Sequence, residues 1–205
     1  MLSAGFWVFA TSISQKLDAF QAYFDCKENQ IKIEELMGNL EFESNLIGKN
    51  LCLFSLIDRT GKALPVTKIL TNKYNLIFIS SFSTCSSCRD KEFEMWSAIL
   101  KTLLQYKDLK MAGVIADYNI NNKKKMIFAF KYAKTYQLKF EWYLDPELKI
   151  LKYFNIKPTD VQLALLVDKS GNIIFAHQAL AKIPEKTEIF QNKLMNFLNS
   201  TDKRG

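Results

Sequence analysis

The chain has 205 residues, of which 48% are hydrophobic and 24% are charged, and this composition predicts a globular protein with one domain and an additional segment. The net charge is +7, but the basic residues are scattered and are mostly lysine. Because the sequence has no arginine-rich arm and no RNA-binding aromatic motif, nucleic-acid binding is not expected.

The N-terminal segment allows two interpretations. Residues 1–13 are apolar apart from small hydroxyl residues, and no charge occurs before Lys16. The segment is too short for an ordinary membrane-spanning helix and lacks the basic region of a secretory signal. It is therefore either the remnant of a signal-anchor, which would tether the protein to a membrane, or a helix packed on the domain. Residues 31–47 are polar and mixed, and we expect a linker there. This divides the chain into an N-terminal helical segment, 1–47, and a domain, 48–200.

The domain begins with a predicted hairpin and a buried strand. Residues 50–58 form an apolar-rich strand, residues 59–62 a turn, and residues 63–69 the return strand. Residues 75–82 are a nearly continuous apolar run, which is typical of a strand covered on both faces. A short loop, 83–87, leads into a helix whose apolar residues recur every three or four positions and predict one buried face.

The second half of the domain alternates between predicted strands and helices. The predicted elements are a strand at 111–117, a helix at 123–137, a strand at 140–144, a short helix from Asp145 to Phe154, a strand at 161–168, a turn at 169–172, a strand at 173–177, and a helix from Pro184. This order predicts an α/β fold with a mixed central sheet, parallel in the middle and antiparallel at the end, flanked by helices on both faces.

Only two of the four cysteines, Cys85 and Cys88, have a spacing that indicates chemistry. A zinc site is not expected, because His177 is the sole histidine and no further ligands lie at suitable spacing. We expect His177 to be structural and Cys52, between apolar residues of a predicted strand, to belong to the core.

The cysteine pair lies at a predicted strand-to-helix junction. A helix N-terminus carries a partial positive charge that stabilises a thiolate, so the pKa of a cysteine there falls below its free value of about 8.5. We therefore predict Cys85 as the nucleophile and Cys88, one turn into the helix, as the resolving cysteine. Arg89 adds positive charge nearby. The alternative is a chance pair of inert thiols.

Four segments, Phe54–Lys62, Leu76–Arg89, Tyr143–Pro146 and Leu165–Ile174, occur together in an order and spacing that resemble the thioredoxin-like superfamily over residues 50–199. The resemblance is to TlpA- and ResA-type reductases and to the redoxin group related to peroxiredoxins. It implies a thioredoxin-like fold with an N-terminal hairpin extension, disulfide exchange without a cofactor or metal, a protein or small-molecule disulfide as substrate, and a thiol electron donor. It also implies a periplasmic or membrane-anchored location, with the cytoplasm as the alternative.

The sequence departs from the family pattern around the cysteines. Thr84 stands where the family usually has Trp, and Ser86 and Ser87 separate the cysteines where many members have Pro. The redox potential of a relative therefore does not carry over. The reductases often have a Glu shortly after the second cysteine that tunes its proton, and Glu92 is the candidate here. Its alternative is a solvated helix carboxylate.

A further departure concerns the cis-proline loop that the family places beside the cysteines. Counting back from the later strand motif, that position holds Gln162, preceded by Val161, whereas Pro158 lies four residues earlier. Either Pro158 serves in a remodelled loop or the cis-proline is absent. The peroxiredoxin motif, which needs Pro and Thr before the first cysteine, has Phe78 and Phe82 at those positions, so peroxidase activity is disfavoured.

Two functions remain open. The first is a thiol-disulfide oxidoreductase that acts through Cys85 and Cys88. The second is a thioredoxin-fold binding or scaffold module whose cysteines no longer turn over, and Gln162 is the observation that favours it.

Overall fold

The computed structural model describes residues 25, 27–81, 86–117, 127, 131, 134–158, 161–180 and 183–202. The chain divides into two compact units, Met1–Glu41 and Phe42–Gly205. In the first unit the described residues are helical, with an exposed Lys32–Glu28 ion pair one turn apart. Helix continues to residue 46, so the linker expected at residues 31–47 is wrong.

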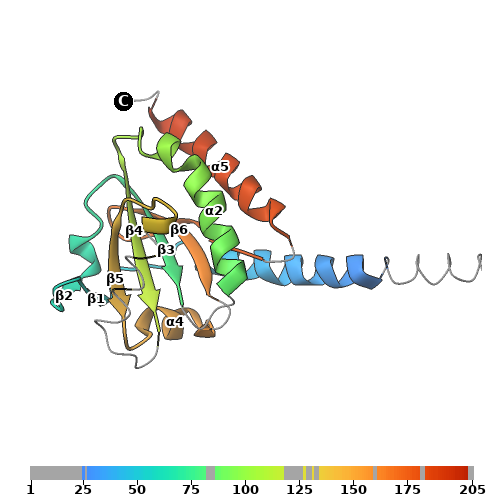
Figure 1. Ribbon diagram of the computed structural model, residues 1–205, viewed down its shortest axis with the longest axis horizontal. Helices are drawn as coiled ribbons and strands as arrows, with labels where there is room; N and C mark the ends of the chain where they lie inside the picture. The colour runs from blue at the N-terminus through green and yellow to red at the C-terminus, as the bar shows by residue number, and fades with distance from the viewer. Residues whose placement is uncertain are drawn as a thin grey trace, which may run out of the picture. The chain divides into compact units, whose positions relative to one another are not determined.

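The second unit contains a seven-stranded mixed sheet in the order β2-β1-β5-β4-β3-β6-β7 (Figure 1). The strands are β1 (Ser55–Ile57), β2 (Ala63–Pro65), β3 (Tyr74–Ser80), β4 (Leu109–Ala116), β5 (Glu141–Asp145), β6 (Gln162–Asp168) and β7 (Ile173–Gln178). β3, β4 and β5 are parallel, and the other neighbouring pairs are antiparallel. The predicted mixed sheet and its hairpin extension are thus confirmed.

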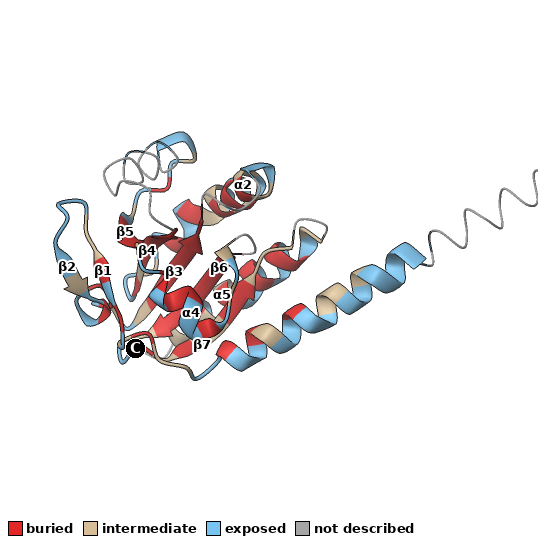
Figure 2. Ribbon diagram, turned by 90° about the horizontal axis from the view of Figure 1, so that it is seen from below, coloured by how far each residue is buried: buried red, intermediate tan, exposed pale blue. Residues whose placement is uncertain are grey.

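Helices cover both faces of the sheet. They are the short 3-10 helix η1 (Val66–Lys68) and the α-helices α2 (Ser86–Leu103), α4 (Lys149–Phe154) and α5 (Glu185–Asp202). The apolar sides of α2 and α5 belong to one core cluster, and those of α4 and η1 to another on the opposite face. In Figure 1, α2 and α5 lie side by side, and Figure 2 shows the strands between the two layers as buried.

β3 explains why a continuous apolar run becomes a central strand. Leu76 and Phe78 pack in the α2 and α5 cluster, whereas Ile77 and Ile79 pack in the opposite cluster, because successive side chains of a strand point to opposite faces. All four are at most 4% exposed. Burial of each side chain contributes roughly 1.5–3 kcal/mol to folding, so this strand fixes the centre of the domain.

Several boundaries differ from the prediction. The first strand covers only Ser55–Ile57, because residues 51–53 form a turn. The compact unit begins before residue 48, since Leu46 is buried in its core. The short helix begins at Lys149 rather than at Asp145, whose carboxylate instead accepts hydrogen bonds from the backbone N–H groups of Lys149 and Ile150.

Two predicted features fall largely outside the described residues. These are the apolar N-terminal stretch, 1–13, and most of the helix expected at 123–137, of which residues 127, 131, 134 and 135 are described as helical. Within the part of the chain that the structure describes, we find no helix with the length and apolar character needed to cross a bilayer.

Candidate thiol site

The candidate site lies at the end of the central strand. β3 runs between β4, parallel to it, and β6, antiparallel to it, and α2 begins at Ser86. Thr84 and Cys85 lie outside the described residues. Cys88 is the third residue of α2 and is partly buried. The described part of α2 therefore follows the central strand β3 after a short segment.

Arg89 points back toward β3. Its side chain is 5% exposed, and its Nη1 donates a hydrogen bond to the backbone carbonyl of Ser81 at 3.2 Å. Ser81 follows directly after β3 and is fully buried. The guanidinium thus fixes the first turn of α2 to the end of the strand and brings a positive charge to the segment that precedes the cysteines.

Glu92 lies one helical turn after Cys88 and is buried at 7% exposure. Its Oε1 accepts a hydrogen bond from Trp96 Nε1 at 2.6 Å, and its Oε2 accepts one from the Thr187 hydroxyl of α5 at 2.9 Å. The interpretation of Glu92 as a solvated carboxylate is therefore wrong. Two neutral donors hold this carboxylate between α2 and α5.

His177 of β7 extends this arrangement. Its Nε2 lies 2.9 Å from Thr187 Oγ1 and 3.6 Å from Glu92 Oε1, and its ring stacks on Phe190. A hydroxyl has one proton to donate. Since Thr187 donates to Glu92, it accepts from His177 Nε2–H. His177 is 1% exposed, and it belongs to a polar network that the sequence did not reveal.

The network continues to Glu43. Its carboxylate lies 3.7 Å from His177 Nδ1, contacts the Lys186 ammonium, and accepts a hydrogen bond from the Gln178 backbone N–H. Lys186 also donates to the Gln178 carbonyl at 2.9 Å. Burial lowers the pKa of Lys186, and the contacts with Glu43 oppose that shift. We define the buried network by its six members, which are Glu43, Glu92, Trp96, His177, Lys186 and Thr187.

The residues proposed at the cis-proline position lie at the start of β6, beside the end of β3. Val161 is fully buried, and Gln162 opens β6 directly opposite Ser80 of β3. The Gln162 carbonyl accepts a hydrogen bond from the Ala179 N–H at 2.9 Å. Among the described residues no peptide bond is cis, so neither Pro158 nor Gln162 follows a cis bond.

Sequence reasoning missed four members of the network, namely Glu43, Trp96 as a donor, Lys186 and Thr187. They come from the N-terminal helix, α2 and α5, which lie far apart in the sequence, so no short motif joins the three parts of the network. Cys52 also differs from expectation. It lies in the turn before β1 and not in a strand, and its Sγ donates to the Ser170 carbonyl at 3.3 Å. Burial and Asp168 raise the pKa of Cys52.

Comparison with known proteins adds fold neighbours. No protein-family model matches the chain, and no curated protein matches its sequence. A candidate thiol:disulfide interchange protein DsbE from Chlorobium tepidum is 18% identical with a TM-score of 0.54, over 74% of this chain and 97% of that one. The C-terminal domain of a candidate thiol-disulfide oxidoreductase from Bacteroides thetaiotaomicron is 19% identical with a TM-score of 0.54. The match covers 75% of this chain and 97% of that one. Peroxidoxin BcpB from Mycobacterium tuberculosis is 13% identical with a TM-score of 0.53. The match covers 75% of this chain and 96% of that one.

These similarities and the strand order define the class of fold. The protein has the thioredoxin-like fold, as the resemblance of its sequence implies. The neighbours carry names from both disulfide exchange and peroxide reduction, so the fold alone does not select between these reactions.

Proposed function

We propose that the protein is a thiol-disulfide oxidoreductase that acts through Cys85 and Cys88. The observation that supports this most strongly is the order of elements: β3 ends at Ser80 and the described part of α2 runs from Ser86, so Cys85 stands in the sequence between a buried strand and a helix. The N–H groups and partial positive charge of a helix N-terminus stabilise a thiolate. This position favours Cys85 as the nucleophile.

The proposed reaction is a pair of disulfide exchanges. The Cys85 thiolate attacks one sulfur of a substrate disulfide, forms a mixed disulfide, and releases the other substrate sulfur as a thiolate. Cys88 then gives up its proton and attacks the Cys85 sulfur, which closes the Cys85–Cys88 disulfide and releases the second substrate thiolate. Two electrons pass to the substrate, and a thiol donor restores the pair.

The neighbouring residues have supporting roles in this proposal. Arg89, bonded to the Ser81 carbonyl, adds positive charge near the reacting thiolate. Glu92 lies at the i+4 position from Cys88, and side chains at this spacing are neighbours on a helix. We assign Glu92 the proton that leaves Cys88. Val161, Gln162 and Thr84 are the remaining supporting residues of the proposal, because they stand at the positions where the resembled family has its cis-proline loop and its Trp beside the cysteines.

The proposed substrates are protein disulfides, which persist in oxidising compartments. We therefore place the activity outside the bacterial cytoplasm, in the periplasm or on a membrane facing it. A role for residues 1–15 as a tether would fit that location.

A second candidate is a binding or scaffold module without turnover. The observation that favours it is the trans peptide bond between Val161 and Gln162, where the resembled family places a cis-proline. Partner binding would then survive the loss of both cysteines.

The test is catalysed reduction of insulin disulfides by dithiothreitol. The wild type and Cys52→Ser should accelerate the reaction, whereas Cys85→Ser should not. Cys88→Ser should accumulate a mixed disulfide, because the resolving thiol is missing. If the wild type gives no acceleration, the oxidoreductase proposal fails and the binding module is favoured. Consumption of hydrogen peroxide faster than insulin reduction would favour a peroxidase instead.

A further inference from the structure

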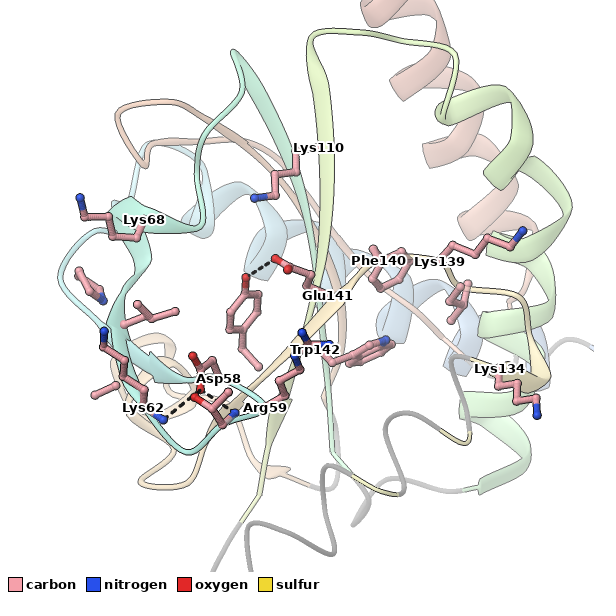
Figure 3. Close-up of a pocket in the computed structure, with 16 residues that line it drawn as sticks. Asp58, Arg59, Lys62, Lys68, Lys110, Lys134, Lys139, Phe140, Glu141 and Trp142 are labelled. Carbon is pink, nitrogen blue, oxygen red and sulfur yellow. Dashed lines mark hydrogen bonds between the residues drawn. The ribbon is translucent and has the colours of Figure 1, made fainter.

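A large basic pocket lies between the β1–β2 hairpin and β5. Its volume is about 1050 Å³, which is just above the usual range for small-molecule sites. Six cationic side chains line it: Arg59, Lys62, Lys68, Lys110, Lys134 and Lys139. Figure 3 shows Lys62 and Lys68 on one side, and Lys134 and Lys139 on the other. The proposed thiol chemistry does not use this pocket.

The two carboxylates in the lining, Asp58 and Glu141, offset only part of the charge of the six cations, which leaves a formal net charge of +4. Asp58 accepts hydrogen bonds from the backbone N–H groups of Thr60 and Lys62 and from the Thr60 hydroxyl, so it is engaged in its own turn. Glu141 accepts a hydrogen bond from the Tyr143 hydroxyl at 2.7 Å. Within the described part of the chain, none of the six cationic side chains forms an ion pair. The pocket therefore favours an anionic occupant.

The pocket also lies along an open strand edge. β5 pairs with β4 over its whole length, but β1 pairs with β5 only at Ile57 and Leu144. At Asp58 the chain turns away, so residues 141–143 have no paired strand on that edge within the described residues. An open edge presents backbone N–H and C=O groups to which an extended peptide can add as a strand.

The geometry points to one occupant. We propose that this pocket binds an acidic, extended segment of a partner protein, which adds to the edge of β5 and places its carboxylates near the six cations. The cations lie on opposite walls and do not converge on a point, which suits charges spaced along a chain rather than one compact anion. This binding proposal does not depend on whether Cys85 and Cys88 exchange disulfides.

Single-stranded nucleic acid fits this pocket less well. Such ligands need exposed aromatic faces on which bases stack. The indole ring of Trp142 instead lies against Gly113, and its centroid is 5.4 Å from that of the Phe140 ring. The Phe140 ring in turn stacks on the Phe78 ring, with the two centroids 5.2 Å apart. These packed rings leave the cationic side chains and the strand edge as the recognition elements.

The test uses the full chain with Cys85→Ser, so that disulfide exchange cannot contribute. The probe is a fluorescein-labelled peptide of alternating Glu and Val, about six residues long, and fluorescence anisotropy measures its binding. Lys62→Glu with Lys139→Glu should weaken binding by about tenfold or more. Lys152→Glu with Lys169→Glu makes the same change in net charge at exposed sites outside the pocket, and should leave affinity within about twofold.

A second comparison tests the strand edge. The same peptide N-methylated at alternate residues cannot form a full strand ladder and should bind more weakly, and the peptide with Lys in place of Glu should not bind. The proposal is overturned if the acidic peptide does not bind, if both double variants bind it equally, or if N-methylation has no effect. Tighter pocket-dependent binding of an oligothymidylate would also overturn it, in favour of nucleic acid.

Discussion

The Thr187 hydroxyl of α5 donates a hydrogen bond of 2.9 Å to the Glu92 carboxylate of α2. This bond joins the C-terminal helix to the helix that carries Cys88. Because His177 Nε2 lies 2.9 Å from the same hydroxyl, Thr187 connects two titratable side chains that are both buried. The stability of the domain and the environment of the proposed thiol site therefore depend on the same residue.

Thr187→Val should destabilise the domain. The valine keeps the shape of threonine but leaves Glu92 Oε2 without its donor and His177 Nε2 without its acceptor, and each buried orphan costs about 1–3 kcal/mol. Urea unfolding of the purified protein measures the loss. Thr201→Val is the matched control, because Thr201 donates only to the Leu198 carbonyl of its own helix. Equal stability of the two variants would contradict the role of Thr187.

Glu92→Gln should change the pH dependence of the resolving step. Glutamine cannot accept the proton that leaves Cys88, so deprotonation of this thiol then depends on hydroxide. The rate of disulfide closure, measured by stopped-flow after the mixed disulfide forms, should therefore fall at neutral pH and reach its midpoint at a higher pH. Glu94→Gln, on the same helix but exposed, is the control. An unshifted profile in Glu92→Gln would mean that Glu92 is only structural.

Lys186 should make stability depend on pH. Burial lowers its pKa below the ordinary value of 10.5, although Glu43 opposes the shift. Between the folded-state value and 10.5 the unfolded chain binds more protons, so the contribution of Lys186 to stability rises with pH across that window. The difference in free energy of unfolding, wild type minus Lys186→Met, should therefore increase as pH approaches 10.5.

Urea unfolding at a series of pH values measures this difference. Lys152→Met, at an exposed position of α4, is the matched control variant. If the difference in free energy of unfolding between wild type and Lys186→Met does not change with pH, or falls as the pH rises, the lowered pKa of Lys186 is contradicted.

Gly113 and Gly38 should respond oppositely to alanine. A Cβ at Gly113 of β4 would lie 2.3 Å from Trp142 Cε3, whereas a Cβ at Gly38 meets nothing within 4 Å. Gly113→Ala should cost about 1–3 kcal/mol and shift the tryptophan fluorescence. Gly38→Ala, within a helix, should be neutral or stabilising by up to about 1 kcal/mol. Thermal unfolding of both variants measures the signs, and a neutral Gly113→Ala would contradict the packing of Trp142.

The sequence predicted the parts of the fold that depend on local pattern. The apolar run that became β3 and the spaced apolar residues of α2 are such patterns, and both elements formed where expected. The linker at 31–47 was wrong because a polar, exposed helix has no strong apolar period to identify it. The domain was expected to begin at residue 48, but the fold also packs Leu46 into the core.

The polar network and the basic pocket could not be predicted in this way. Glu43 and Lys186 are far apart in sequence and meet only because the end of the N-terminal helix and the start of α5 come together. The pocket depends on where β1 leaves β5, which is set by one residue pair, Ile57 and Leu144. These relationships arise from strand register and tertiary packing, which leave no short motif in the sequence.

The reduction potential of the Cys85–Cys88 pair tests the central claim most directly. We would equilibrate the protein with glutathione buffers and quantify the disulfide by mass spectrometry, with Cys85→Ser as the control and Cys52→Ser to remove a thiol outside the pair. The account predicts a reversible two-electron couple between about −200 and −300 mV, absent in Cys85→Ser. If both thiols stay reduced across that range, the oxidoreductase proposal is contradicted and the binding module becomes the better account.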